Sequence, residues 1–549
     1  MPHKRVSLYL YLSGIAIMLL GLPTSRFLMS ISQFILVGAW LSYGIERVLE
    51  EGEHPGIKWP LVLFGKLFSG LWRQKEALIF LSIIGIHIIG MLWTQDYAYG
   101  FRDLRIKLPM LLLPVVFSTM PALSKKQLNS LMGVYLFALF AASAEGIFIL
   151  FTKDITDIRE ISPHISHVRL ALNIVLGVFI TIYLTLSRKS GLKNIYRLVA
   201  LILGVWLFLF LLIMKSPTGL LIFAITAGIV FLMYVFGLQN RVLRTIIPVF
   251  LGLMVMVAGY SLYTMIHEYT SVESFRYEDL DTKTARGNTY THDTIHFPGV
   301  ENGSYIGLYI CPEELEEAWA GRSGMDFHGR DHKDQELKVT LIRYLNSRGL
   351  RKDADGIAAL SDADIRAIEG GVANHYYISK FSVRGRIYQM LFGMDLFRRT
   401  GNPNGNSMLQ RREYWKAGWN IFMAHPVFGV GTGDLKKSFK QYYIETNSRL
   451  LPEYRHRAHN QYLSIAIALG VMGLLVFFAG FFYPPYKLKR HRVWYFTVIL
   501  SIVVLSFIAE DTLETQAGST FTAFFYSLFL WGTLSPKGEK PKTQSDENI

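Results

Sequence analysis

Long apolar runs recur along the chain, with polar segments between them. The runs are about 17 to 24 residues long, and about 20 apolar helical residues are enough to cross the hydrocarbon core of a bilayer. We therefore predict an all-α polytopic membrane protein with about 12 transmembrane helices and one large loop of mixed short helices. The predicted spans lie near residues 6–22, 27–45, 77–93, 106–120, 128–151, 168–187, 198–214, 218–238, 243–263, 460–482, 493–509 and 515–534.

The composition supports this class. Of the 549 residues, 51% are hydrophobic and 14% aromatic, and the mean hydropathy is +0.28. The N-terminus has the basic and apolar regions of a signal peptide but no small-x-small cleavage site, so we predict a retained first span. The single cysteine, Cys311, excludes an intramolecular disulfide framework and a cysteine-rich metal site. We expect contacts with membrane lipids and none with nucleic acid.

The distribution of Lys and Arg predicts the orientation. Alternate segments beginning with the N-terminus hold 22 of these residues, whereas the short segments on the other side hold 7. Because basic residues concentrate on the cytoplasmic side, both termini are predicted to be cytoplasmic, including the tail 535–549. Helices 1–9 then occupy residues 1–263 and helices 10–12 residues 460–534, and the loop 264–459 faces outward.

The large loop divides by charge. Residues 264–370 carry 12 Lys and Arg against 20 Asp and Glu, whereas residues 371–459 carry 14 against 5. The first half resembles a small soluble acidic cap. The second, basic half contains the motifs on which the functional prediction depends.

The densest group of candidate residues lies between Gln410 and Gly473. Residues 410–423 predict an amphipathic helix with Arg411 and Arg412 near its start. Further on, Arg457 comes just before His459 and Asn460, where the chain enters the tenth span. A neutral imidazole there can act as a general base, although an interfacial histidine with a structural hydrogen bond is the alternative. Asn460 either caps the helix or binds a sugar hydroxyl.

Other cations occur at outward-facing ends of spans, where they oppose the charge rule. Each either has a partner, extends to lipid phosphates, or pairs with a nearby carboxylate such as Asp103. As a set, they suit a pyrophosphate, whose oxygens match arginine side chains and can be stabilised without a metal ion. The set comprises Arg102, Arg105, Lys107, Arg169 and Lys215.

Few residues stand at metal-ligand spacing. His164 and His167 are three residues apart, but no third ligand is near them in the sequence, so we predict neither a metal nor a cofactor. Glu145, inside the fifth span, either pairs with a cation or accepts a proton. The acidic residues of the segment 510–514 either orient His459 or a cation, or belong to a solvated loop.

The order of several short motifs resembles the O-antigen ligase and O-antigen polymerase superfamily. The motifs are R-x-x-W from Arg412, AHPVFGVGTG from Ala424, HNQYL from His459, HVRLALN around Arg169, KSPTGLL from Lys215, and EDTLETQAGSTFTAFF from Glu510. Pro217 stands where that superfamily often has an arginine. The text of the loop resembles the Bacteroidetes branch.

This resemblance implies a metal-independent, inverting glycosyltransferase with a GT-C-like fold in the bacterial inner membrane. The donor would be a glycan on undecaprenyl pyrophosphate at the periplasmic face, and a ligase would transfer it to a sugar hydroxyl of the lipid A core. Arg169 and Arg412 match positions that hold the pyrophosphate, and His459 matches the base. We place Arg102, Arg105, Lys215, Arg411, Arg457, Asn460 and His167 as further substrate contacts.

Two alternatives remain at this stage, and the oligomeric state stays open. A polymerase would join lipid-linked repeat units by the same chemistry. A transporter or flippase of anionic lipids would also need outward cations, but it should show broken helices and related halves. The sequence shows neither feature, so we expect unbroken spans.

Overall fold

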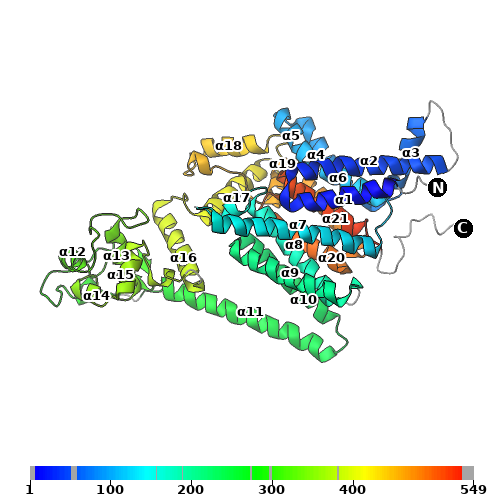
Figure 1. The fold of residues 1–549 in the computed structure, drawn as a ribbon. Helices are drawn as coiled ribbons and strands as arrows, with labels where there is room; N and C mark the ends of the chain where they lie inside the picture. Colours follow the sequence, from blue (N-terminus) through cyan, green and yellow to red (C-terminus); the bar gives the residue numbers. More distant parts are fainter. Residues whose placement is uncertain are drawn as a thin grey trace. The chain divides into compact units, whose positions relative to one another are not determined.

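The computed structural model describes residues 6–50, 59–155, 157–187, 190–272, 275–295, 299–379 and 382–534. The predicted cytoplasmic tail 535–549 lies outside these residues. Two compact units divide the chain: one comprises residues 1–237 and 411–549, and the other residues 238–410. We call them the helical unit and the inserted unit, and Figure 1 shows their elements.

The helical unit contains most of the long apolar helices. Its helices are α1 (Val6–Thr24), α2 (Arg26–Glu50), α3 (Trp59–Trp72), α4 (Lys75–Ile89), α5 (Tyr97–Lys107), α6 (Pro109–Thr119), α7 (Lys125–Thr152), α8 (His167–Leu186), α9 (Asn194–Ile213), α10 (Pro217–Phe236), α18 (Leu435–Glu445), α19 (Gln461–Lys487), α20 (Trp494–Ala509) and α21 (Gln516–Leu530), together with most of α17 (Ser407–Ala424). Short 3-10 turns include Gly90–Trp93 and Thr512–Glu514.

The fold class is confirmed as all-α. In the part of the chain that the structure describes, nine helices are long and apolar enough to cross a membrane. Three of the 12 predicted spans correspond to shorter helices, α6, α20 and α21, of 11, 16 and 15 residues. The predicted span 106–120 is wrong at its start, because α5 ends at Lys107 and Pro109 begins a new helix. Proline lacks the backbone N–H that a continuous helix needs there.

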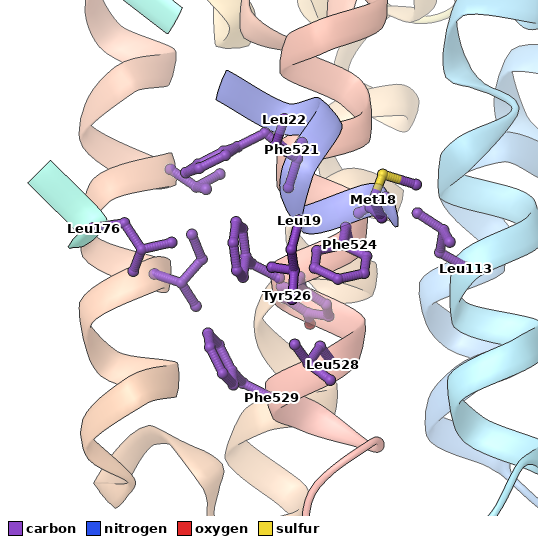
Figure 2. Close-up of a cluster of buried hydrophobic side chains, with 14 of the residues drawn as sticks. Met18, Leu19, Leu22, Leu113, Leu176, Phe521, Phe524, Tyr526, Leu528 and Phe529 are labelled. Atoms are coloured by element: carbon purple, nitrogen blue, oxygen red, sulfur yellow. The ribbon is translucent and has the colours of Figure 1, made fainter. Parts of the chain in front are cut away.

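Helix α21 lies at the centre of the helical unit. Every residue from Gly518 to Leu530 is buried, including Ser519, Thr520, Thr522 and Ser527. Figure 2 shows its side chains meeting those of α1, α6 and α8, among them Phe524, Leu19, Leu113 and Leu176. The segment just before α21 is therefore held against a rigid core.

The inserted unit begins with the long helix α11 (Arg241–Thr270) and continues in short elements. These are β1 (Val300–Glu301), β2 (Ser304–Tyr305), α12 (Pro312–Ala320), α13 (Leu337–Ser347), α14 (Ala354–Ala358), α15 (Asp362–Glu369), the turn His375–Tyr377 and α16 (Val383–Thr400). The two strands form an antiparallel hairpin. Trp319, Leu341 and Leu345 are fully buried in a separate hydrophobic core. The unit thus has a core of its own, built from the sequence predicted as an acidic cap.

Candidate functional site

Glu514, in the short segment between α20 and α21, pairs with two cationic side chains. Its carboxylate accepts hydrogen bonds from Lys107 Nζ at 2.8 Å and from Arg457 at 3.1 Å. Lys107 also donates to Asp103 Oδ1 at 2.6 Å. The Lys107 side chain is 1% exposed and that of Glu514 6%. For Lys107, the alternative of a carboxylate partner such as Asp103 is therefore confirmed.

The charges of Lys107, Glu514 and Asp103 shift one another's pKa. Burial alone would lower the pKa of Lys107, but Asp103 and Glu514 raise it to about 12. Burial would raise the pKa of Glu514, but Lys107 and Arg457 hold it well below its usual range. Burial and the charge of Glu514 raise the pKa of Asp103. Charged Glu514 thus fixes Arg457 two residues before His459, since buried ions need matched partners.

Asp511 connects the same segment to the start of α19. Its Oδ1 atom accepts hydrogen bonds from the backbone N–H of Asn460 at 3.1 Å and from Ser464 Oγ at 2.7 Å. Arg169 is buried and donates to Thr512 Oγ1 at 3.1 Å and to the Asp511 carbonyl at 3.4 Å. The segment 510–514 therefore links the start of α8 to that of α19.

His459 lies at the N-terminal end of α19 with a backbone φ of +47°. A positive φ is uncommon for a residue other than glycine, and such conformations cluster at functional sites. Asn460 caps the helix by accepting from Leu463 N at 3.0 Å, while its Nδ2 donates to the Ile508 carbonyl at 3.1 Å. Both polar side-chain atoms of Asn460 are therefore engaged within the protein, and capping of α19 accounts for an asparagine at this position.

The R-x-x-W motif of α17 packs against the turn that precedes α19. Trp415 Nε1 donates to the Ala458 carbonyl at 2.9 Å, and the Tyr414 ring lies 5.8 Å from the His459 ring, centroid to centroid. Arg412 lies on the exposed side of α17, and Arg411 is 3.6 Å from Glu510. Helix α17 thus carries two guanidinium groups, on Arg411 and Arg412, and contacts the candidate base through Tyr414.

The glycine-rich motif fills a break in α19. At Gly470 the helix has φ +67° and ψ −164°, and the backbone of the loop 426–431 supplies the missing hydrogen bonds. Val430 N and Gly431 N donate to the Ile467 and Ala468 carbonyls, both at 2.9 Å, and Val471 N donates to the Pro426 carbonyl at 2.8 Å. The expectation of unbroken spans is wrong here. The backbone groups of α19 that lose their partners at the break are hydrogen bonded by the loop, because apolar surroundings offer no water to replace them.

Residues 378–478, which include α17, the glycine-rich loop and His459, match a family model described as O-antigen ligase. This stretch is an O-antigen ligase domain. Members of the family are glycosyltransferase-like enzymes that act on lipid-linked glycans in membranes. A search of curated proteins found no match to the chain.

The remaining predicted contacts lie outside the O-antigen ligase domain. Arg102 and Arg105 are exposed on α5, whereas Asp103 and Lys107 of the same helix are buried. Lys215 is exposed in the turn between α9 and α10, with φ +51°. His167 begins α8 and is half-buried.

Two further predictions concern histidine and glutamate. His164 Nε2 lies 3.0 Å from a carboxylate oxygen of Glu145, so Glu145 has a side-chain partner. Among the described residues, no group of three or more His, Cys, Asp or Glu side chains is arranged to hold a metal ion.

The sequence did not identify several residues of the network around the O-antigen ligase domain. Buried Gln461 donates to Glu514 at 3.3 Å and accepts from Leu513 N at 2.7 Å, and Tyr99 accepts from Arg457 at 3.0 Å. The sequence offers one signal for this network: Asp103 and Lys107 are four residues apart, which places them on one face of a helix where they can pair.

Proposed function

We propose that the protein is a bacterial inner-membrane ligase that transfers a glycan from undecaprenyl pyrophosphate to a sugar hydroxyl of the lipid A core. The proposal rests chiefly on one observation: a single acidic segment, 510–514, draws Arg169, Arg411 and Arg457 to the end of α19 that begins beside His459. The O-antigen ligase domain supports the general class of reaction.

In this proposal His459 accepts the proton of the acceptor hydroxyl. The acceptor oxygen forms a bond to the anomeric carbon while the bond from that carbon to the pyrophosphate oxygen breaks, which inverts the configuration. The undecaprenyl diphosphate that leaves carries the electron pair of the broken bond. Arg412, Arg411 and Arg457 stabilise its charge. Arg169, which is buried, holds the segment 510–514 through hydrogen bonds to Thr512 and the Asp511 carbonyl. The enzyme needs only to align a donor that is already activated.

The charge pattern supports an active site on the periplasmic face with both termini in the cytoplasm. Fixed guanidinium groups supply the positive charge that leaving-group stabilisation requires, so we propose metal-independent transfer without a cofactor. The broken helix α19 does not favour transport, because the loop 426–431 occupies the break. Polymerisation of lipid-linked repeat units uses the same chemistry and is the alternative.

Gene deletion followed by electrophoresis of the lipopolysaccharide distinguishes the two reactions. A ligase predicts loss of every glycan-capped band while long glycan accumulates on the undecaprenyl carrier. Core capped with a single repeat unit would instead identify a polymerase. In the purified protein, His459→Ala should abolish transfer with no change in the elution volume of the folded protein, and EDTA should not inhibit. Full activity of His459→Ala would remove the assignment of the base.

A further inference from the structure

The inserted unit contains an open cavity of about 370 Å³, within the size range of small-ligand sites. Segments far apart in the sequence converge on it: the end of α11, the β1–β2 turn, the end of α13, the turn His375–Tyr377 and α16. Figure 1 shows α11 ending beside α16. The side chains used below are those of Glu268, Arg348, His375, Tyr376 and Tyr388.

Glu268 supplies a carboxylate to the lining of the cavity. It lies 3.3 Å from Arg384, and Tyr388, which also lines the cavity, is 2% exposed. Arg384 also donates to the Tyr376 hydroxyl at 3.1 Å. The Glu268 side chain is 53% exposed, so its carboxylate oxygens remain accessible to a ligand while Arg384 lies beside them.

Arg348 adds donors to the same lining. Arg348 is exposed at the end of α13, and among the described residues no hydrogen bond or ion pair engages its guanidinium group. The neighbouring turn is fixed by the backbone, since His375 N donates to Ser347 Oγ at 2.9 Å. A guanidinium group can donate several hydrogen bonds in one plane. The lining of the cavity thus offers both charged acceptors and charged donors.

Aromatic rings complete the lining. The His375 and Tyr376 rings lie 3.9 Å apart, and the Tyr388 ring meets the Tyr376 ring edge-on at 5.2 Å. Both His375 and Tyr376 are partly exposed. The carbon-bound hydrogens on one face of a sugar ring are apolar and pack on such rings, whereas its hydroxyl groups both donate and accept. The lining therefore matches a saccharide better than a purely anionic or apolar ligand.

The cavity also lies at a suitable height. Glu268 is in the same helix as Tyr263, the last residue of the predicted ninth span, and five residues further along. At 1.5 Å per residue, it stands about 8 Å beyond the end of that span. Sugars attached to a lipid carrier begin at such a distance from the hydrocarbon.

We propose that this cavity of the inserted unit, between Glu268 and Arg348 and beside Tyr376, is a binding site for a sugar residue of the lipid-linked glycan. The proposal rests on the proposed function for the source of the saccharide. It assigns to the inserted unit a role in substrate recognition, separate from the chemistry at His459.

The test measures binding of lipid-free glycan to the full-length protein in detergent. The probe is the polysaccharide released by mild acid from lipopolysaccharide of the native cells, and saturation-transfer NMR or calorimetry reports its binding. Arg348→Ala and Tyr376→Leu should each weaken binding at least tenfold. Arg366→Ala removes an exposed arginine of α15, outside the cavity, and should bind like the wild type. Equal elution volumes on size exclusion show that the variants are folded.

Two readouts separate this inference from the proposed function. Arg348→Ala should raise KM for the lipid-linked donor and leave kcat unchanged. No binding to the wild type, equal binding by all variants, or displacement by excess inorganic phosphate would overturn the saccharide site. If transfer still requires His459 in that case, the proposed function stands. Glycan binding that depends on Arg348 in a protein without transferase activity would support the site and refute the proposed function.

Discussion

Replacing Glu514 with glutamine tests whether the acidic segment holds the site together. Glu514→Gln keeps the shape of the side chain and one acceptor oxygen but removes the negative charge. Lys107, 2.8 Å away, and Arg457, 3.1 Å away, then face each other without the carboxylate they share. The buried Lys107–Glu514 pair then loses its carboxylate, which is costly because the lysine charge stays buried without that partner.

The burial of these groups determines the size of the effect. Removing one partner of a buried ion pair costs about 3–5 kcal/mol, and here the side chains of Lys107 and Glu514 are 1% and 6% exposed. Asp103 offsets part of the loss, because the charge of Glu514 no longer raises its pKa and it ionises beside Lys107. We therefore expect a loss near the lower end, about 3 kcal/mol of unfolding free energy, together with a large loss of transfer activity.

The measurement is the free energy of unfolding in mixed detergent micelles, followed by tryptophan fluorescence. Glu510→Gln is the matched control on the same segment. Its partner Arg411 is 38% exposed and lies 3.6 Å away, so that change should cost less than about 1 kcal/mol. A double variant combines Glu514→Gln with Lys107→Met, so that the lysine left without its carboxylate is also removed. A coupling energy of about 1–3 kcal/mol is expected between Lys107 and Glu514.

Two results would refute this reasoning. One is a Glu514→Gln protein as stable as Glu510→Gln, which would mean that the shared carboxylate does not stabilise the segment. The other is strict additivity of the Lys107 and Glu514 changes, which would mean that the two side chains do not interact in the folded protein.

Three further predictions concern neighbouring features. Gly470→Ala should unfold at clearly lower denaturant, by about 2 kcal/mol or more, because the added Cβ would lie 2.1 Å from the Val427 carbonyl oxygen at a positive φ. Trp415→Phe should lower stability by about 1 kcal/mol and transfer activity by more, since it removes the hydrogen bond to Ala458 and one ring of the indole while keeping an aromatic side chain; both are measured on the same preparation. The raised pKa of Asp103 lets the folded protein keep a proton that the unfolded chain releases, so stability should fall as pH rises above about 4. Asp103→Asn should flatten that slope in unfolding measured across pH.

The sequence predicted the elements that depend on local pattern. Apolar runs indicated most helices, and a carboxylate partner such as Asp103 was one alternative for the outward cations, which the hydrogen bond from Lys107 confirms for that lysine. It also placed Arg457 beside His459 in one motif. Contacts between distant segments carried no such signal. Arg169 and Thr512 are 343 residues apart, and Arg457 and Glu514 are 57 apart.

The two errors in the helices have different origins. Residues around Gly470 form an apolar run, and an isolated glycine is tolerated in such a helix, so the run gives no sign of a break. The break is stable because a loop some 40 residues earlier donates to the Ile467 and Ala468 carbonyls. Residues 106–120 are apolar enough for one span, but Pro109 lacks the backbone N–H that a helix continuous with α5 would need. Only the break at Gly470 depends on partners outside the segment.

The geometry changes the relative weight of the candidate phosphate contacts. Arg169 ranks first by resemblance, yet its guanidinium group is buried and donates to Thr512 and the Asp511 carbonyl. Arg102 and Arg105, placed lower because position alone supported them, are exposed, and among the described residues neither side chain has a hydrogen bond or ion pair. A diphosphate must compete for a cation that already has a partner but not for one that water solvates. Arg169 therefore suits a supporting role, and exchange of Arg102 or Arg105 for glutamine should raise KM for the lipid-linked donor.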